Sequence, residues 1–222
     1  MKKPKAKENI LTVNEREAFV NAVESDEEEL AVKGMLFTGM RVSEFVHMRR
    51  EWINWSEGII HIPHCTPCRC GQSCIKPRYR HFKTDPKTKD RIRLARPEMT
   101  KPPNTWQVKT KHAERPIPIL PEVRDILKNY FMDYESIMEL LDNRVKTWKL
   151  IRAVGQRARI GHKVFPHALR ATFATMLVER GFEDPVGLTQ IMGWADIKMS
   201  MVYVRQSGIG LKKKIDRIWN SG

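Results

Sequence analysis

The sequence lacks any long hydrophobic run. None of its apolar stretches approaches the ~20 consecutive residues that a helix needs to cross a bilayer, which excludes a helical membrane protein. Residues 1–9 are basic and polar with no apolar segment behind them, so we expect no secretory signal peptide. Hydrophobic residues make up 41% of the 222 residues, which is enough for a packed core and excludes a wholly disordered chain. We therefore expect a folded cytoplasmic protein.

Acidic residues are also scarce. The chain has 26 Asp and Glu against 40 Lys and Arg, which gives a net charge of +14. Residues 76–115 contain 13 basic and 4 acidic residues, and residues 144–163 contain seven basic residues and no acidic one. One charged run is often only a solvated surface, but two basic tracts on one chain favour an electropositive groove. Nucleic acid is the first candidate for the partner, and an acidic membrane surface is the second.

Proline is concentrated in the middle of the chain. Ten of the 13 prolines lie between Pro63 and Pro121, so long helices are expected only in the flanks. There, Gly39 is a helix stop signal, while Pro166 and Gly181 are typical of a helix start and end. The expected helices cover residues 11–23 (with Asn14 as a possible cap), 28–38, 43–50, 122–134, 149–159 and 166–181. Short strands are expected at 58–62, 104–109 and 115–120, the last two joined as a β-hairpin by residues 110–114.

The four cysteines fall within ten residues of one another. The Cys65-x-x-Cys68 spacing lets two thiolates bind one metal ion, and a cytoplasmic chain seldom uses such a cluster for disulfides. We predict a structural zinc site rather than a catalytic one, because four sulfurs leave no position for water. A nearby histidine in place of one cysteine, or a reduced loop without metal, are the alternatives. The predicted ligands are Cys65, Cys68, Cys70 and Cys74, with His61, His64 and His81 close in sequence.

The segment from Phe37 to Phe45 places an arginine at a tight corner. One predicted helix ends at Gly39 and the next begins near Ser43, which holds Arg41 between them. Glu44 follows Arg41 at a spacing that lets its carboxylate fix the guanidinium. Such a corner suits a clamp for an oxyanion.

Two later segments carry further candidates. In Pro-His-Ala-Leu-Arg at 166–170, the i, i+3 spacing places His167 and Arg170 on one face of the first helical turn. Farther along, Met-Gly-Trp ends at Trp194 and is followed nine residues later by Tyr203. Taken singly, each of these residues has an ordinary structural explanation as a surface, core or packing residue.

Together, the segments resemble the tyrosine recombinase family, the integrases and site-specific recombinases of phages, plasmids and chromosomes. In that family T-G-x-R-x-S-E is followed by a lysine in a β-hairpin, then H-x-x-R, then L-G-(H or W), then a nucleophilic tyrosine. This chain has Thr38 to Glu44, Lys109-Thr110-Lys111, His167 to Arg170, Met192-Gly193-Trp194 and Tyr203 in the same order. The resemblance spans the chain from about Leu11 to Tyr203.

The resemblance implies an enzyme that cuts and rejoins DNA without a nucleotide or a catalytic metal. Tyr203 would attack a phosphodiester to form a 3′-phosphotyrosine link, and Arg41 and Arg170 would neutralise the phosphate oxygens. His167 would assist proton transfer. Trp194 would donate its indole N–H to the phosphate or pack on the tyrosine, since it cannot accept a proton.

The resemblance also implies a hairpin lysine that protonates the leaving 5′-oxygen. Lys109 and Lys111 both fit, and Lys109 is favoured because the end of a strand positions a side chain better than a turn does. The structural alternative is that both lysines contact phosphate without transferring a proton.

The expected fold class is α+β: a mostly helical tyrosine recombinase catalytic domain with a small antiparallel β-sheet and a Cys-rich, zinc-binding insert. The expected organisation is a basic tail at 1–9 and the catalytic domain at 10–222. Within that domain, residues 59–105 are the insert and 207–222 a C-terminal tail. No N-terminal core-binding domain is expected, so we predict that the insert docks on double-stranded DNA. The tail would pack on a neighbouring protomer of a homo-oligomer, a tetramer in synapsis by resemblance, or fold back on its own domain.

Two other functions fit the same sequence. A type IB topoisomerase would use this set of residues to relax one duplex without synapsis. A zinc-containing DNA-binding protein with an inactive recombinase fold is the second alternative, and the presence of all the catalytic residue types argues against it. We expect a cytoplasmic, nucleoid-associated protein of a mobile genetic element, and the sequence is compatible with a viral, a plasmid or a chromosomal host element.

Overall fold

The chain divides into two units. The computed structural model describes residues 6–68, 81–84, 91–94, 105–108, 110–206, 215–216 and 219–220. The first unit comprises Met1–Pro63 and Val108–Gly222, and the second comprises His64–Gln107. The described part of the chain is mostly helical with small antiparallel sheets, as predicted.

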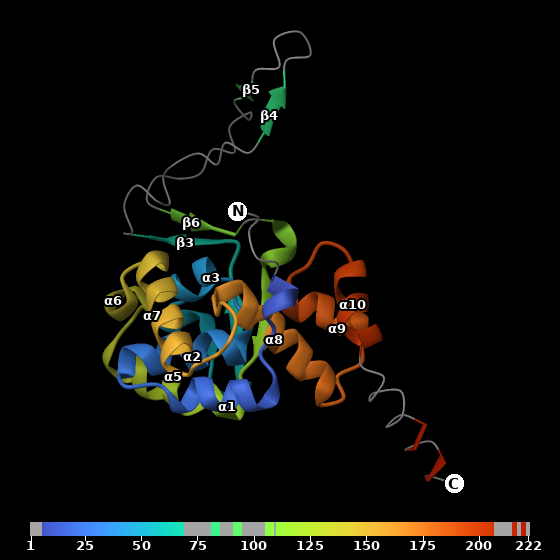
Figure 1. Ribbon diagram of the computed structural model, residues 1–222. Helices are drawn as coiled ribbons and strands as arrows, with labels where there is room; N and C mark the ends of the chain where they lie inside the picture. Colours follow the sequence, from blue (N-terminus) through green and yellow to red (C-terminus); the bar gives the residue numbers. More distant parts are fainter. Residues whose placement is uncertain are drawn as a thin grey trace. The chain divides into compact units, whose positions relative to one another are not determined.

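The first unit contains all the helices of the described part of the chain (Figure 1). Among the described residues, its 3₁₀-helices are η1 (Ala6–Asn9), η2 (Arg50–Trp52) and η3 (Lys111–Ala113). Its α-helices are α1 (Val13–Asn21), α2 (Asp26–Thr38), α3 (Val42–Val46), α5 (Pro121–Asp133), α6 (Met138–Leu141), α7 (Arg144–Arg157), α8 (Pro166–Glu179), α9 (Pro185–Met192) and α10 (Lys198–Gln206). No helix in these ranges is both long and apolar enough to cross a bilayer.

Capping side chains set two helix starts that differ from the predicted ones. Thr12, not Asn14, caps α1: its hydroxyl accepts from the Glu15 N–H, and the Glu15 carboxylate accepts from the Thr12 N–H at 2.9 Å. Asn143 caps α7, accepting from two backbone N–H groups at 2.9 and 3.0 Å. Helix α7 therefore begins at Arg144, before the predicted start at residue 149.

Helix α3 is shorter than the predicted span of 43–50. The Ser43 carbonyl, which would accept the His47 N–H in a longer α-helix, instead lies 2.7 Å from His47 Nδ1. The His47 N–H binds the Glu44 carbonyl at 3.1 Å, which tightens the last turn. Helix α8, in contrast, begins at Pro166 and is followed by Gly181 at φ 98°, in agreement with the prediction.

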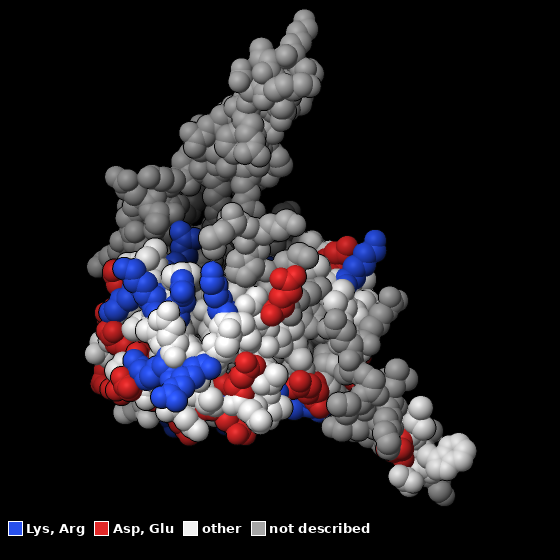
Figure 2. Space-filling model, in the orientation of Figure 1, with Lys and Arg blue, Asp and Glu red and all other residues white. Residues whose placement is uncertain are grey.

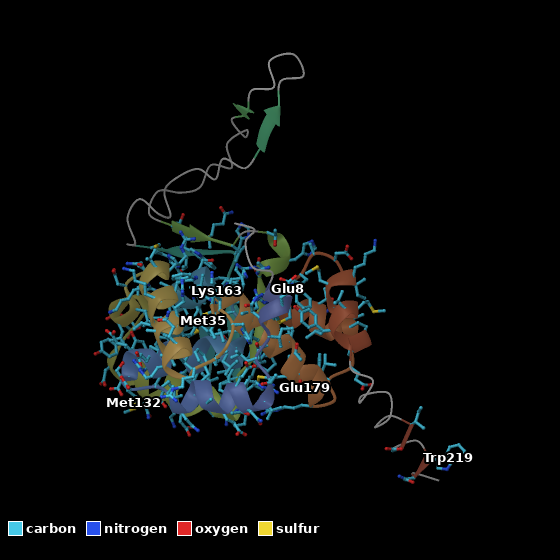
Figure 3. The ribbon with its side chains drawn as sticks, viewed as in Figure 1. Glu8, Met35, Met132, Lys163, Glu179 and Trp219 are labelled. Atoms are coloured by element: carbon cyan, nitrogen blue, oxygen red, sulfur yellow. The ribbon has the colours of Figure 1, made fainter. Side chains whose placement is uncertain are left out.

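Helix α2 forms the centre of the first unit. It contacts α5, α7 and α8 (Figure 1), and most of its side chains are buried. Met35, labelled in Figure 3, is fully buried on this helix. At its end, Gly39 has φ 60°, and a Cβ there would lie 2.2 Å from the Phe173 ring of α8. Glycine therefore lets the backbone turn sharply against α8 and delivers the next residues, Met40 and Arg41, to a buried corner.

A three-stranded antiparallel sheet with the order β1-β2-β7 completes the first unit. Strands β1 (Ile53–Asn54), β2 (Ile59–Ile62) and β7 (Arg115–Pro118) pair so that Ile60 lies opposite both Ile53 and Ile117. The predicted hairpin between 104–109 and 115–120 is wrong. Strand β7 pairs with β2, while β6 (Thr105–Gln107) pairs with β3 (Cys65–Pro67).

The second unit contains two short antiparallel ladders in its described residues. One joins β3 and β6, with Thr66 opposite Trp106. The other joins β4 (His81–Thr84) and β5 (Arg91–Leu94). This unit overlaps most of the predicted insert at 59–105, but β2 of that span lies in the first unit.

Candidate active site

Arg41 is held at the corner between α2 and α3. Its backbone N–H donates to Glu44 Oε2 at 2.8 Å, and its Nη1 donates to Glu44 Oε1 at 2.5 Å. Its Nη2 donates to the Gly193 carbonyl at 2.9 Å. The predicted contact between Glu44 and Arg41 is therefore present. Because the Arg41 side chain keeps 20% of its surface exposed, its guanidinium is both fixed and accessible.

Arg170 reaches the same corner from α8. Its Nη1 donates to the Gly39 carbonyl at 2.5 Å, and its Nη2 donates to the Met192 carbonyl. The residue is only 6% exposed. Burial lowers the pKa of Arg170, as do the charges of Arg41 and Arg115, whereas Glu44 counteracts them. His167, one turn earlier on α8, is exposed.

Tyr203 lies on α10 and is 7% exposed. Its ring stacks on Trp194, with ring centroids 5.3 Å apart and an interplanar angle of 13°. Burial raises the pKa of Tyr203, and the positive charge of Arg170 partly offsets this effect. The phenol is therefore protonated at neutral pH and lies within the electrostatic influence of one of the two predicted arginines.

A third arginine, Arg115, belongs to the same cluster and is not among the predicted site residues. It is 5% exposed at the start of β7, and its Nη2 donates to Glu44 Oε2 at 2.9 Å. The available signal was the inward position of an arginine in the alternating Arg-Pro-Ile-Pro strand, where a buried charge needs a partner.

The three guanidiniums meet at the carboxyl end of α9. Arg115 Nε donates to the Ile191 carbonyl at 2.6 Å, Arg170 to the Met192 carbonyl and Arg41 to the Gly193 carbonyl. The last carbonyls of a helix have no partners within the helix and carry partial negative charge, so cations suit this end. Gly193 has φ 56°, and a Cβ there would lie 2.9 Å from Arg115 Cδ. The three residues that precede Trp194 therefore each hold one arginine through a backbone carbonyl.

Glu44 is the single carboxylate that hydrogen-bonds to this cluster in the described part of the chain. Burial raises its pKa, but Arg115, Arg41 and Arg170 outweigh burial and lower it to about 2. One carboxylate facing three arginines leaves an excess of positive charge at the corner. That excess is suited to the charge that grows on phosphate oxygens during displacement at phosphorus.

The remaining predicted residues lie partly outside the described structure. Lys109 is outside the described residues, and Lys111 lies in η3 with no described side chain. Cys65 is exposed on β3 and Cys68 is buried, while Cys70 and Cys74 are outside the described residues. Within the described ranges, no group of three or more potential metal ligands is present.

Known proteins resemble this chain in sequence. Residues 104–208 match the model of the phage integrase family. The chain is 26% identical over 223 aligned residues to tyrosine recombinase XerA of Pyrococcus furiosus, covering 96% of this chain and 63% of that protein. It is 37% identical over 73 residues to tyrosine recombinase XerD of Staphylococcus haemolyticus, covering 33% of this chain and 23% of that protein. The chain thus spans less than two thirds of these relatives.

The same fold occurs in a solved integrase structure. The Tn1549 transposon integrase in complex with transposon right end DNA superposes with a TM-score of 0.64 at 16% identity, covering 97% of this chain and 67% of that one. At this identity the likeness concerns the fold alone.

Proposed function

We propose that this chain carries a tyrosine recombinase catalytic domain and that it cuts and rejoins DNA at specific sites through a 3′-phosphotyrosine intermediate. The observation that carries the proposal is the convergence of Arg41 and Arg170 on the end of α9, with Tyr203 close enough for the charge of Arg170 to act on it. Arg41 is distant in sequence from Arg170 and Tyr203, and the fold brings two cations suited to bind phosphate together in the unit that also holds the candidate nucleophile.

In the proposed reaction, the Tyr203 oxygen forms a bond to the scissile phosphorus and the bond from phosphorus to the 5′-oxygen breaks. Arg41 and Arg170 neutralise the non-bridging oxygens, for which a planar, permanently charged guanidinium is well suited. The phosphotyrosine keeps the energy of the broken ester, so attack by a 5′-hydroxyl reverses the step without a nucleotide. The reaction requires no catalytic cofactor.

Two protons must move. We assign His167, exposed on the first turn of α8, to assist removal of the tyrosine proton. The leaving 5′-oxygen takes its proton from a lysine, Lys109 in preference to Lys111. Trp194 stacks on Tyr203 and holds its ring in place, and its indole N–H is available only as a donor.

The proposed substrate is double-stranded DNA. Figure 2 shows Lys and Arg side chains gathered over α7 in the first unit. Arg144 and Lys149 are exposed on this helix, and Arg159 is exposed just after its end. Such a surface attracts the phosphate backbone. Recombination joins two sites, so we further propose a homo-oligomer, a tetramer in synapsis, in the cytoplasm at the nucleoid. The relatives favour this function over relaxation by a topoisomerase or simple binding.

The proposal is tested on nicked duplexes with a randomised core, in which the short fragment released by attack diffuses away. Wild-type protein is expected to form covalent adducts that survive denaturing electrophoresis, and sequencing them gives the preferred site. Strand exchange between two copies of that site distinguishes a recombinase from a topoisomerase. The absence of adducts from the whole pool would leave only a DNA-binding role.

We also propose that the cysteine cluster binds a structural zinc ion. The support is the spacing of Cys65, Cys68, Cys70 and Cys74. We expect purified protein to contain equimolar zinc and the double variant Cys65→Ser, Cys68→Ser to lose it, as measured by elemental analysis. Met132→Ser, at an exposed position on α5, serves as the control. Metal-free wild-type protein with four titratable thiols would refute the proposal.

The basic insert is proposed to supply DNA contacts. The basic tract at 76–115 begins in the insert and lies largely outside the described residues. The support for the proposal is therefore the charge of this tract. Removal of residues 65–96 is expected to weaken DNA binding at least ~10-fold and to flatten its dependence on salt, because fewer counterions are released. Fluorescence anisotropy over a salt series measures both quantities. An unchanged affinity and salt slope would show that the insert does not bind DNA.

A further inference from the structure

Arg115 connects three elements of the candidate site. Its Nη2 donates to Glu44 Oε2 of α3 at 2.9 Å, its Nε to the Ile191 carbonyl of α9 at 2.6 Å, and its Nη1 to the Ala113 carbonyl of η3 at 2.7 Å. All three nitrogens of the guanidinium thus donate within the protein. Its side chain is only 3% exposed. Arg115 is therefore sealed off from an incoming phosphate, unlike Arg41.

Glu44 connects Arg115 to Arg41, because its carboxylate accepts hydrogen bonds from both residues. Its Oε2 accepts from both the Arg41 backbone and Arg115 Nη2, and its Oε1 accepts from Arg41 Nη1. The Glu44 side chain is 2% exposed, so it has little access to water that could replace a lost partner. The orientation of the carboxylate therefore depends on the two arginines that donate hydrogen bonds to it.

The charge of Glu44 depends on the same contact. The charged groups that face it are Arg41 at the start of α3, Arg115 on β7 and Arg170 on α8. Arg115 is the strongest of these in lowering the Glu44 pKa, against burial, which raises it. Without Arg115, burial has less opposition and the carboxyl group takes up a proton more readily.

We propose that Arg115 is a positioning residue that keeps Glu44 ionised and oriented, so that Arg41 presents its guanidinium to the scissile phosphate. This inference rests on the proposed function. It assigns to a residue outside the predicted site the task of fixing the more exposed of the two phosphate-binding arginines. Because Arg41 neutralises the charge of the phosphate, loss of this role should slow the reaction more on a charged phosphate than on a less charged analogue. General destabilisation of the protein would slow both reactions equally.

The test compares two substrates built on a site selected from the randomised pool. One carries a normal scissile phosphate, and the other carries a methylphosphonate, in which an uncharged methyl group replaces a non-bridging oxygen. For Arg115→Met we expect adduct formation on phosphate to fall on the order of 10²-fold, the scale of a misplaced reacting group. On methylphosphonate there is less charge for Arg41 to neutralise. We therefore expect adduct formation by Arg115→Met to be much closer to the wild-type level on this substrate.

A pH series gives an independent readout. Wild-type Glu44 has a pKa of about 2 and stays ionised throughout an assay at mildly acidic to neutral pH. In Arg115→Met that pKa is expected to rise, so adduct formation should decline as pH falls over a range where the wild-type rate is unaffected by Glu44. Arg115→Lys, which keeps one charge, should shift the decline less.

Arg157→Met is the matched control. Arg157 also binds a glutamate and a carbonyl, Glu28 at 2.8 Å and Ala22 at 2.6 Å, but lies outside the arginine cluster. In Arg157→Met, adduct formation should change by the same factor on the phosphate and the methylphosphonate substrate.

Two results with folded Arg115→Met would overturn the inference. One is an equal loss of adduct formation on both substrates, and the other is no loss on the phosphate substrate. If Arg115→Met does not fold, Arg115→Lys is measured in its place. The role is refuted if the ratio of adduct formation on phosphate to that on methylphosphonate is the same in Arg115→Lys as in the wild type. Failure of wild-type protein to form adducts would instead refute the proposed function.

Discussion

Replacing Tyr203 with phenylalanine is expected to abolish the covalent protein–DNA adduct while leaving the fold intact. The substitution removes the oxygen that would form the bond to phosphorus, and no other atom of the ring can take its place. The ring itself remains stacked on Trp194 in its buried position. Loss of one hydroxyl should cost only ~1 kcal/mol in the free energy of unfolding. Denaturing electrophoresis of the nicked substrate measures the adduct, and urea unfolding measures stability.

Tyr134→Phe is the matched control for this experiment. Tyr134 is 38% exposed and stacks on Tyr130 with ring centroids 4.7 Å apart, so the same hydroxyl is removed from a stacked ring away from the arginines. This variant should form adducts at the wild-type rate. Adducts from Tyr203→Phe would show that another residue is the nucleophile. DNA binding by Tyr203→Phe should remain, which separates catalysis from binding.

Arg170→Lys is expected to slow adduct formation by about 10²- to 10³-fold, the effect of removing a preorganised donor from a developing oxyanion. Lysine keeps the positive charge but loses the planar fork that binds the Gly39 and Met192 carbonyls together. These carbonyls are buried with the arginine, so we also expect a loss of ~1–3 kcal/mol in the free energy of unfolding. Single-turnover kinetics and urea unfolding measure the two effects separately.

Arg180→Lys tests whether the effect is specific to the site. Arg180 directly follows α8 and pairs with Glu122 at 2.7 Å, with 58% of its side chain exposed. An exposed pair contributes little to stability, so neither the rate nor the unfolding midpoint should change noticeably. If folded Arg170→Lys formed adducts as fast as wild type, the arginine would have only a structural role.

The buried arrangement explains why these two substitutions should act so differently. Tyr203 contributes an atom that forms a bond, whereas Arg170 contributes both charge and structure. Arg170 joins the end of α2 to the end of α9, which come from opposite ends of the sequence. A change at Arg170 therefore disturbs packing and chemistry together, and only rates measured on folded protein isolate the second.

Signals that depend on a few neighbouring residues could be predicted from the sequence. Pro166 starts α8 because its fixed φ and missing N–H suit the first turn, and Gly39 ends α2 because glycine tolerates a positive φ. The contact between Arg41 and Glu44 spans one turn and was equally accessible. The order of Arg41, His167, Arg170, Trp194 and Tyr203 was sufficient to identify the resemblance.

Pairing between distant segments could not be predicted in this way. The strand at Thr105–Gln107 had a suitable partner next to it in sequence, yet it pairs with β3, a strand much earlier in the chain, while β7 pairs with β2. Strand pairing depends on which segments the rest of the fold brings together, and the alternation of side chains is the same for either partner. Helix starts at Thr12 and Asn143 were missed because several nearby residues could have capped them.

The sequence by itself determined the chemistry available to this protein: a tyrosine, two arginines and a histidine in a recognisable order, on a strongly basic chain. Only the tertiary structure decided how they are held. It joined Arg41, Arg170 and the unpredicted Arg115 to three successive carbonyls at the end of α9, with Glu44 between two of them. The physical reason is that a buried charge must find its partners in space, and those partners are set by packing rather than by neighbouring letters.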